Sequence, residues 1–312
     1  MHTTIPALHV GQGTHQAGLT VFPVWVDAPR IGMLDWAPAS LRIAERAEGA
    51  AVDTLEAENL ADRSLVALEG DLLEGGWQNR MLARSLVLAP RERRPLPALC
   101  VEQGRWGGGA DHSAGGRRAS LVVRYGDEAA QHRISDEFQR HDRQSRVWRR
   151  IDAIEQRLGR SETRSFTHQL DRQSIRPPRM IDGQRGVIIG IGGRVMGLEL
   201  FCSGSGLRSR YAGIVQSAAV DARLADPVAT SAERARAFAR ALQGRRLHGG
   251  EGHGGESGER WFEVARDDDR IAATGLGARI ASPSDGAVGA PDQRGLLHLT
   301  ALDRAHPLLA SV

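Results

Sequence analysis

Short apolar runs, separated by polar and glycine-containing breaks, fill the N-terminal part of the chain, and this pattern predicts strands rather than helices. Residues 18–27 are rich in β-branched and aromatic side chains, and Pro23 places this strand at an edge or a bulge, because proline cannot donate to a ladder. A short helix at 37–48 and a glycine-rich, polar loop at 107–116 are also predicted. Further extended segments are expected at 51–57, 64–68, 78–82, 85–89 and 95–101.

The apolar period becomes helical in the second half of the chain. Residues 145–158 are predicted as a helix that ends at Gly159, because four apolar positions form one stripe, namely Val147, Ile151, Ile154 and Leu158. Two further helices are predicted at 207–224 and 231–243. The Ser-Gly-Ser-Gly sequence around Ser205 suits capping of the first of them better than a nucleophile turn, since the glycine two positions before Ser205 is missing.

Residues 187–191 and 195–201 predict a β-hairpin around Gly192 and Gly193, because a tight two-residue turn needs positive φ angles. The Gly190-x-Gly-Gly sequence does not match a dinucleotide-binding fingerprint, in which a helix follows the glycines and holds the pyrophosphate at its N-terminus. Here a strand follows instead. Short closing strands are predicted at 261–264, 270–273 and 295–300, after a glycine-rich loop at 245–259.

Together these segments predict an α+β protein in which a β-rich N-terminal half packs against a C-terminal half of helices and a β-hairpin. The length suits one large domain or two modest ones, and we expect a single domain over residues 1–312 that can be divided into a β-rich subregion at 1–125 and a second subregion at 126–312. Hydrophobic residues make up 41% of the chain, yet no apolar run reaches the roughly 18 residues that a membrane span needs. The first residues show no secretory pattern, so the cytoplasm is the expected location.

The charge pattern argues against a nucleic-acid partner. All basic residues are arginine, and the formal net charge is only +3. Acidic residues are interleaved with the arginines throughout the sequence, as at 91–94 and 266–270. Nucleic-acid-binding proteins usually gather basic residues on one face. We therefore expect neither nucleic acid nor a membrane as partner.

Cysteine and histidine patterns do not specify a metal site. The only cysteines, Cys100 and Cys202, are too few for a disulfide framework and are expected to be reduced and buried. His248, Glu251 and His253 have suitable ligand chemistry, but the glycines around them supply no rigid scaffold. A solvent-exposed loop is the simpler interpretation of that segment.

The most informative stretch is residues 69–106. Alternation along a strand places Gln78 and Arg80 on one face, and Cys100 and Glu102 share a face of a later strand. If the two strands are neighbours, these four side chains converge on one surface. Glu69 ends the preceding apolar strand and joins them.

This set combines hydrogen-bond donors and acceptors. Arg80 and Arg105 suit bidentate binding of phosphate or carboxylate, whereas Glu69 and Glu102 suit a general base, a divalent metal or a hydroxyl group. We expect these four side chains to form one cluster. The simpler interpretation is a structural network of Glu–Arg pairs that satisfies strand ends and loops.

The same stretch resembles the ARG and rhodanese-phosphatase-superfamily-associated protein domain family. The likeness rests on Glu69-Gly70, Gln78-Asn79-Arg80, Cys100-Val101-Glu102 and Gly104-Arg105-Trp106, and it continues through 144–148, 186–201 and Leu296-Leu-His-Leu. The resemblance implies work alongside ADP-ribosylglycohydrolases and phosphatases, from gene neighbourhood, and hence a role near ADP-ribose or other NAD-derived nucleotides.

The leading hypothesis is a nucleotide-related binding or processing protein whose small, phosphate-bearing ligand is ADP-ribose or another NAD-derived metabolite. The arginines would hold the diphosphate and Trp106 would stack on a base. The expected ligand-binding residues are Gln78, Asn79, Arg80, Arg105 and Trp106, and the expected catalytic residues are Glu69, Cys100 and Glu102. One alternative is a non-catalytic interaction module in which residues 69–106 are structural. The other is a metal-dependent enzyme that uses the three catalytic candidates, with a divalent metal as cofactor.

Overall fold

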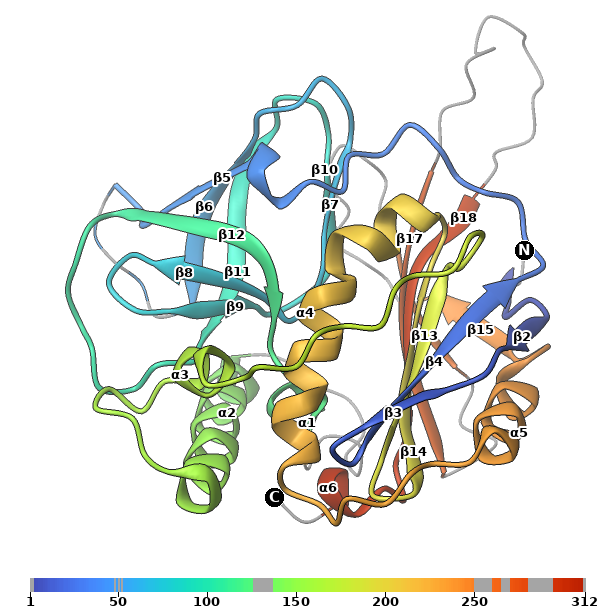
Figure 1. Ribbon diagram of the computed structural model, residues 1–312. Coiled ribbons are helices and arrows are strands. Elements are labelled where there is room, and N and C mark those ends of the chain that lie inside the picture. Colours follow the sequence, from blue (N-terminus) through green and yellow to red (C-terminus); the bar gives the residue numbers. More distant parts are fainter. Residues whose placement is uncertain are drawn as a thin grey trace, which may run out of the picture.

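A closed β-barrel and a large antiparallel sheet lie on either side of one long helix, α4 (Gly204–Ala222) (Figure 1). The structure is a computed structural model. It describes residues 3–47, 49, 51, 53–125, 137–249, 260–264, 270–279 and 294–310. None of the helices among these residues is both long enough and apolar enough to cross a membrane.

The barrel is built from the first half of the chain. Its six strands are β5 (Leu41–Ala44), β6 (Thr54–Asn59), β8 (Asp71–Gly75), β9 (Arg80–Leu82), β11 (Arg93–Cys100) and β12 (Asp111–Arg118). They close in the order β11-β6-β5-β12-β8-β9, and every pair is antiparallel. Leucines such as Leu55, Leu73 and Leu96 fill the interior. A separate ribbon pairs β7 (Leu65–Ala67) with β10 (Leu86–Leu88).

The large sheet combines strands from both ends of the chain. Its order is β1-β15-β16-β17-β18-β14-β13-β4-β2, and β3 also pairs with β4. The bounds are β1 (Thr3–Thr4), β2 (Leu8–Val10), β3 (Thr14–Gln16), β4 (Leu19–Val26), β13 (Gly186–Ile191), β14 (Arg194–Phe201), β15 (Arg246–Gly249), β16 (Arg260–Val264), β17 (Ile271–Arg279) and β18 (Arg294–Asp303). The predicted hairpin is confirmed as β13–β14, with φ angles of 57° and 77° at Gly192 and Gly193.

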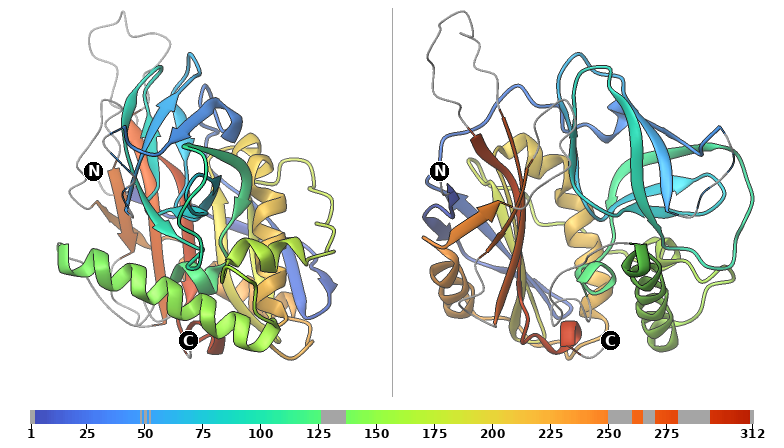
Figure 2. Two further views of the ribbon diagram at one scale, coloured as in Figure 1. Left: turned by 90° about the vertical axis from the view of Figure 1, so that its left-hand side faces the viewer. Right: turned by 180° about the vertical axis from the view of Figure 1, so that it is seen from behind.

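Helices cover both faces of this sheet. Helix α4 lies between the sheet and the barrel, and α5 (Ala232–Leu242) covers the opposite face (Figures 1 and 2). Ser203 caps α4 by accepting from the Gly206 N–H, as expected from the sequence. The remaining helices are α1 (Leu121–Tyr125), α2 (Glu137–Leu158), α3 (Phe166–Asp171), α6 (Pro307–Ala310) and the 3₁₀ turn η1 (Pro38–Ser40).

One continuous apolar cluster joins these parts. It contains Leu72 of the barrel, Val215 of α4 and Val187 of the sheet, all fully buried. The α+β class, with a β-rich N-terminal half packed on helices and a hairpin, is confirmed. Strands β1 to β4 nevertheless belong to the sheet of the second half, so chain order and spatial grouping differ at the N-terminus.

Three sequence-based predictions are wrong in detail. Residues 37–48 form η1 and strand β5, because Leu41 and Ile43 point into the barrel while Arg42 is exposed. Residues 107–116 are not a loop throughout, since β12 occupies Asp111–Arg118 between β5 and β8. The β8–β12 pairing is irregular between Ala114 and Arg118, a stretch that contains two glycines. The strand also has no run of apolar residues, so the sequence pattern did not indicate it. Helix α2 begins at Glu137, well before residue 145.

The expectation that Pro23 lies in an edge strand or at a bulge is wrong for the edge and correct for the bulge, since residues 11–13 lie opposite only Phe22 and Pro23. Strand β4 is internal, with β13 on one side and both β2 and β3 on the other. The carbonyl of Pro23 accepts from the Gly11 N–H, so its missing N–H faces the same side. That side is the gap between β2 and β3, where no ladder bond is lost.

The close approach of α4 to the barrel makes a prediction about Gly213. A Cβ at this position would lie 2.3 Å from the Gly116 carbonyl oxygen, a backbone atom that cannot swing aside. We expect Gly213→Ala to destabilise the protein by about 1–3 kcal/mol through overpacking, although alanine ordinarily favours a helix. The control is Gly204→Ala, whose Cβ meets only the Gln184 carbonyl oxygen at 3.4 Å. Urea unfolding measures both, and a Gly213→Ala protein as stable as Gly204→Ala would contradict this packing.

Candidate functional site

The polar residues of the 69–106 stretch fall into three hydrogen-bond networks instead of one cluster. We call them the rim network (Asn79, Glu102 and Arg105), the barrel network (Glu45, Arg80 and His112) and the junction network (Glu69, Asp71, Arg118, Arg124, Glu199 and Arg210). Each network connects a different set of helices, strands and loops.

The rim network lies where the chain leaves β11. Glu102 Oε2 accepts from the Asn79 N–H at 2.9 Å and from Arg105 Nε and Nη2 at 3.0 and 2.7 Å. Arg105 also donates to the carbonyls of Gly76 and Gly107 at 2.7 and 3.2 Å. Burial opposes charge on Glu102, but Arg105 and the Asn79 amide hold its pKa below the usual value. Arg105 is thus committed to internal acceptors, although 31% of its side chain is exposed.

The Gln78 and Cys100 strands are neighbours, which meets the condition set in the sequence analysis. Arg80 is opposite Cys100 in the β9–β11 ladder, and the Cys100 thiol donates to Gln78 Oε1 at 2.9 Å. The Gln144 side chain of α2 bonds both the N–H and the C=O of Cys100, at 2.8 and 2.9 Å. Gln78 and Gln144 therefore fix helix α2 and the β11 end, and both are buried.

Both cysteines are free and buried, as predicted. Burial raises the pKa of the Cys100 thiol to about 11, and burial likewise raises the pKa of Cys202 to about 11. A thiol with such a pKa is almost entirely protonated near neutral pH and is a poor nucleophile. The catalytic role suggested for Cys100 receives no support from its surroundings.

The barrel network occupies the inside of the barrel wall. Arg80 is fully buried and donates from Nη2 to both Glu45 oxygens, at 3.1 and 3.2 Å, and from Nη1 to the Ala51 carbonyl at 2.5 Å. His112 Nε2 lies 3.1 Å from Glu45 Oε1. Burial lowers the pKa of His112, so the neutral ring donates Nε2–H to Glu45. A ligand would have to displace Glu45 to reach Arg80.

The junction network connects the barrel to the sheet and to α4. Glu69 Oε2 accepts from Arg124 Nη2 at 2.7 Å and from the Tyr125 hydroxyl. Arg124 Nη1 also donates to Glu199 Oε1 on β14 at 2.6 Å. Asp71 on β8 accepts from Arg118 Nη1 at 2.5 Å and from Arg210 Nη2 of α4 at 2.9 Å. Three guanidinium groups and three carboxylates balance here in charge.

The electrostatics of the junction keep these groups ionised. Burial would raise the pKa of Glu199, but Arg124, Arg118 and His298 hold it well below the usual range. Burial would likewise raise the pKa of Asp71, yet Arg210 and Arg118 hold it low. Burial lowers the pKa of His298, which donates its Nε2–H to Glu199 at 2.5 Å as a neutral ring.

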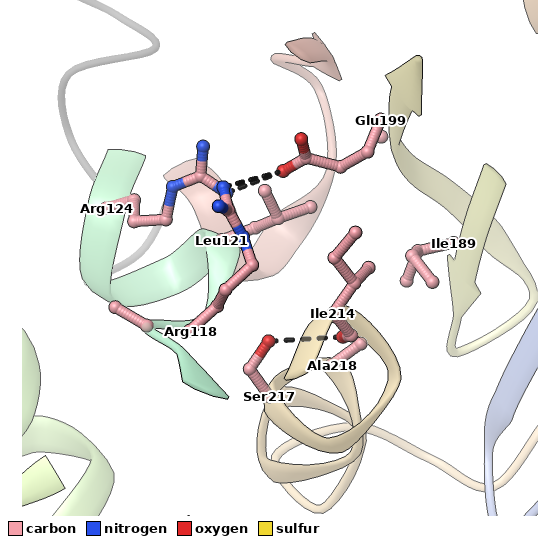
Figure 3. A pocket seen from close by; sticks show the side chains of 10 residues that line it. Arg118, Leu121, Arg124, Ile189, Glu199, Ile214, Ser217 and Ala218 are labelled. Atoms are coloured by element: carbon pink, nitrogen blue, oxygen red, sulfur yellow. Dashed lines mark hydrogen bonds and ion pairs between the residues drawn. The ribbon is translucent and has the colours of Figure 1, made fainter. Parts of the chain in front are cut away.

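A small cavity lies against this network (Figure 3). Arg118 and Arg124 reach toward Glu199 above it, and Leu121, Ile189 and Ile214 form its apolar side, with Ser217, Ala218, Ala119 and Gly197 completing the lining. Its volume of about 10 Å³ is the space of a single water molecule. A nucleotide does not fit in this cavity.

The barrel surface beside the rim network carries an aromatic pair. The rings of Trp77 and Trp106 meet edge to face, with centroids 5.4 Å apart and an interplanar angle of 85°. Trp106 is 51% exposed, which is unusual for so large an apolar side chain. The Gly107 N–H donates to the Trp77 carbonyl at 3.1 Å and fixes the two chain segments together. We call Trp77, Gln103, Arg105 and Trp106 the barrel rim.

Metal-binding geometry is not found in the part of the chain that the structure describes, where no three His, Cys, Asp or Glu side chains gather around one point. Glu69, Cys100 and Glu102 therefore do not form a common metal site. His248 lies in strand β15, whereas Glu251 and His253 lie outside the described residues. The roles of Glu69 and Glu102 as bases remain predictions.

Of the six junction residues only Glu69 was a candidate from the sequence, so five were missed, among them Asp71 of β8. Arg118, Arg124, Glu199 and Arg210 come from four different elements and meet only in the folded chain. Glu199 had a readable signal, since it is the one charged residue in the otherwise apolar segment 195–201. A charge on a buried strand needs a partner. The three arginines had no such signal among so many others.

Comparison with known protein families gives one match that spans most of the chain. The model of the family described as "ARG and Rhodanese-Phosphatase-superfamily-associated Protein domain" matches residues 7–279. Neither the curated proteins nor the solved structures give a match.

The junction network predicts that losing one carboxylate is costly. Glu199→Gln keeps the size of the side chain but leaves Arg124 and Arg118 with one unbalanced buried charge, so we expect a loss of about 3–5 kcal/mol in unfolding free energy. The control is Glu58→Gln, whose carboxylate pairs with Arg42 and Arg93 at the surface and should matter little. Urea denaturation compares them. Equal stability of the two variants would show that the junction is not a buried charge network.

The buried histidines predict a loss of stability in acid. Burial lowers the pKa of His112, His298 and His306 from 6.5, so the unfolded chain takes up protons first as the pH falls below about 6.5. Asp221 acts in the opposite direction, because burial raises its pKa from 3.8 to about 7 and the folded state takes up that proton first. We expect Asp221→Asn to lose stability more steeply than the wild type between pH 7.5 and 5.5.

Urea midpoints at three pH values in this range test the sign. Asp226→Asn, at an exposed carboxyl, serves as the control and should follow the wild type. A midpoint that rises on acidification in Asp221→Asn would mean that the histidines are not buried as neutral rings.

Proposed function

The chain belongs to the ARG and Rhodanese-Phosphatase-superfamily-associated Protein domain family, and from this premise we propose that it binds an NAD-derived nucleotide such as ADP-ribose at the barrel rim. The observation that carries the proposal is the exposed indole of Trp106, fixed edge to face against Trp77. A rigid aromatic face at the surface is a stacking platform for a nucleobase, since every base offers a π-face.

The rim network supports this platform. Arg105 joins Glu102 on one side to the Gly76 and Gly107 carbonyls on the other, so it ties together the segments that precede and follow the two tryptophans. In the proposal Arg105 positions Trp106, and its exposed edge contributes positive potential near the ligand. Gln78 and Arg80, which the sequence analysis placed in the ligand site, lie behind this surface and hold the strands.

Binding is favoured over chemical processing by the states of the candidate catalytic groups. Glu102 accepts three hydrogen bonds through one oxygen. Glu69 is ion-paired to Arg124 and its carboxylate is mostly buried. The Cys100 thiol is buried and protonated. None of these three presents a free base or nucleophile at the barrel rim, so the proposed protein captures its ligand without converting it.

The alternative is an interaction module in which residues 69–106 serve structure alone. The internal pairing of Arg80, Glu102 and Arg105 favours it, because these side chains need no ligand to be satisfied. The exposed Trp106 would then contact a protein partner. The two proposals differ in one measurable respect, which is whether a nucleotide raises the melting temperature.

Two free cysteines suit a reducing compartment, so the proposal keeps the cytoplasm as location.

The stacking role of Trp106 predicts a loss of affinity in Trp106→Ala. Base–aromatic stacking contributes about 1–3 kcal/mol, so we expect ADP-ribose to bind roughly five- to 150-fold more weakly by isothermal titration calorimetry. The control is Met33→Ala, which removes another large exposed apolar side chain, 66% exposed, from a different loop. Its affinity should equal that of the wild type.

Two outcomes count against the proposal. Saturation at a hundredfold excess over Kd should stabilise the wild type by about 2.7 kcal/mol. If no NAD-derived phosphate shifts its melting temperature at millimolar concentration, nucleotide binding is wrong and the interaction-module proposal replaces it. If Trp106→Ala binds as tightly as the wild type, the ligand lies elsewhere.

A further inference from the structure

Arg164 has a backbone conformation that arginine rarely adopts. Its φ angle is +50°, in the left-handed region that suits glycine and is strained for residues with a side chain. In the part of the chain that the structure describes, four residues other than glycine share this property, namely Ala17, Met33, Arg91 and Arg164. Backbone strain of this kind persists only where the surroundings hold it, and it clusters at functional sites.

The surroundings of Arg164 are the barrel rim. The Gln103 N–H donates to the Arg164 carbonyl at 3.2 Å, and the Gly104 N–H donates to the Thr163 carbonyl at 2.7 Å. On the other side, Ser165 forms an isolated bridge with Glu102. Residues 163–165 are therefore bonded to residues 102–104, which directly precede Arg105 and Trp106. These contacts hold the backbone of Arg164 in its conformation.

The guanidinium of Arg164 is exposed and has no carboxylate partner among the described residues. Its one hydrogen bond, from Nη1 to the neutral amide oxygen of Gln103, measures 2.9 Å. By contrast, Arg105 is paired with Glu102, and the exposed Arg91 is paired with Asp62. Arg164 thus brings an unbalanced positive charge to the barrel rim.

We propose that Arg164 binds the phosphate of the ligand whose base stacks on Trp106. Gln103 accepts one guanidinium N–H and orients the group, which leaves other N–H donors for a bidentate contact with phosphate oxygens. Gln103 and Trp106 are three residues apart, at most about 10 Å along an extended chain. The stacking ring and the guanidinium are therefore held at one short stretch of the chain, as a ligand that carries both a base and a phosphate requires.

This inference rests on the proposed function and assigns the ligand's phosphate to one residue, Arg164. An uncharged nucleoside would use the aromatic pair alone, whereas a nucleoside phosphate would use both Trp106 and Arg164. The ligand class is therefore a phosphorylated nucleotide, and its affinity should depend on the phosphate through one named residue. The strained φ angle gives a way to separate this role from a structural one, because glycine adopts the same backbone without strain.

The test compares Arg164→Gly with Arg91→Gly. Both substitutions remove an exposed arginine from a left-handed position, with φ angles of 50° and 63°, and each leaves a backbone that suits glycine. Both variants should melt at or above the wild-type temperature. Isothermal titration calorimetry then measures adenosine, AMP and ADP-ribose against each protein. We expect Arg164→Gly to bind AMP and ADP-ribose roughly tenfold more weakly or worse, with adenosine unchanged, and Arg91→Gly to match the wild type for all three.

The outcomes separate the inference from the function on which it rests. If the wild type binds ADP-ribose and Arg164→Gly binds it equally well, the role of Arg164 is wrong and the stacking site stands. If Arg164→Gly loses adenosine as well as ADP-ribose, Arg164 acts only by holding the loop, and the phosphate contact is also wrong. If the wild type binds none of the three compounds at millimolar concentration, the proposed function fails and the inference fails with it.

Discussion

The arrangement of barrel, helix and sheet depends on one buried set of ion pairs. Asp71 pairs with both Arg118 and Arg210, and Arg124 pairs with both Glu69 and Glu199. These side chains come from the barrel and the turn before β8, from α1 and α4, and from β14. An unpaired charge in the interior is very costly, so loss of any one partner in this set should cost several kcal/mol of stability, about 3–5. A buried ion pair is weak evidence for added stability, but it strongly discriminates against other ways of docking the barrel on the sheet.

This constraint also explains why most charged residues of the 69–106 stretch are engaged within the protein. Glu69 pairs with Arg124, Arg80 pairs with Glu45, and Glu102 pairs with Arg105. These residues of the 69–106 stretch therefore stabilise the barrel and its contacts with neighbouring elements. What remains for a ligand is the surface that this scaffold presents. The rim network fixes Trp106 beside Trp77, and the same segment fixes Arg164. The scaffold and the proposed binding surface are adjacent parts of one motif.

Local features were predictable from the sequence and long-range ones were not. The β13–β14 hairpin and the cap of α4 follow from residues within a few positions, such as Gly192, Gly193 and Ser203. Strands β5 and β12 were missed because their pairing in a closed barrel depends on distant partners. The site hypothesis depended on the pairing of the Gln78 and Cys100 strands, and the fold meets that condition, since Arg80 lies opposite Cys100.

The partners of the charged residues could not be read in the same way. Same-face spacing suggested that Glu69, Arg80, Glu102 and Arg105 meet, whereas Glu69 bonds Arg124, which is 55 positions away, and Arg80 bonds Glu45, which is 35 positions away. Alternation gives the face of a strand but not what covers it. The left-handed conformation of Arg164 is likewise invisible in the sequence, since it is imposed by the docking of its loop on residues 103–104.

The nucleotide is proposed to bind at the barrel rim, with the junction network as its support. Hydrogen–deuterium exchange of the wild type, with and without saturating ADP-ribose, tests this directly. Binding at the barrel rim should slow exchange in peptides that cover residues 103–107 and 163–165, with no change in peptides that cover 69–72 and 118–124. Protection confined to the junction peptides, with the rim unchanged, would contradict it.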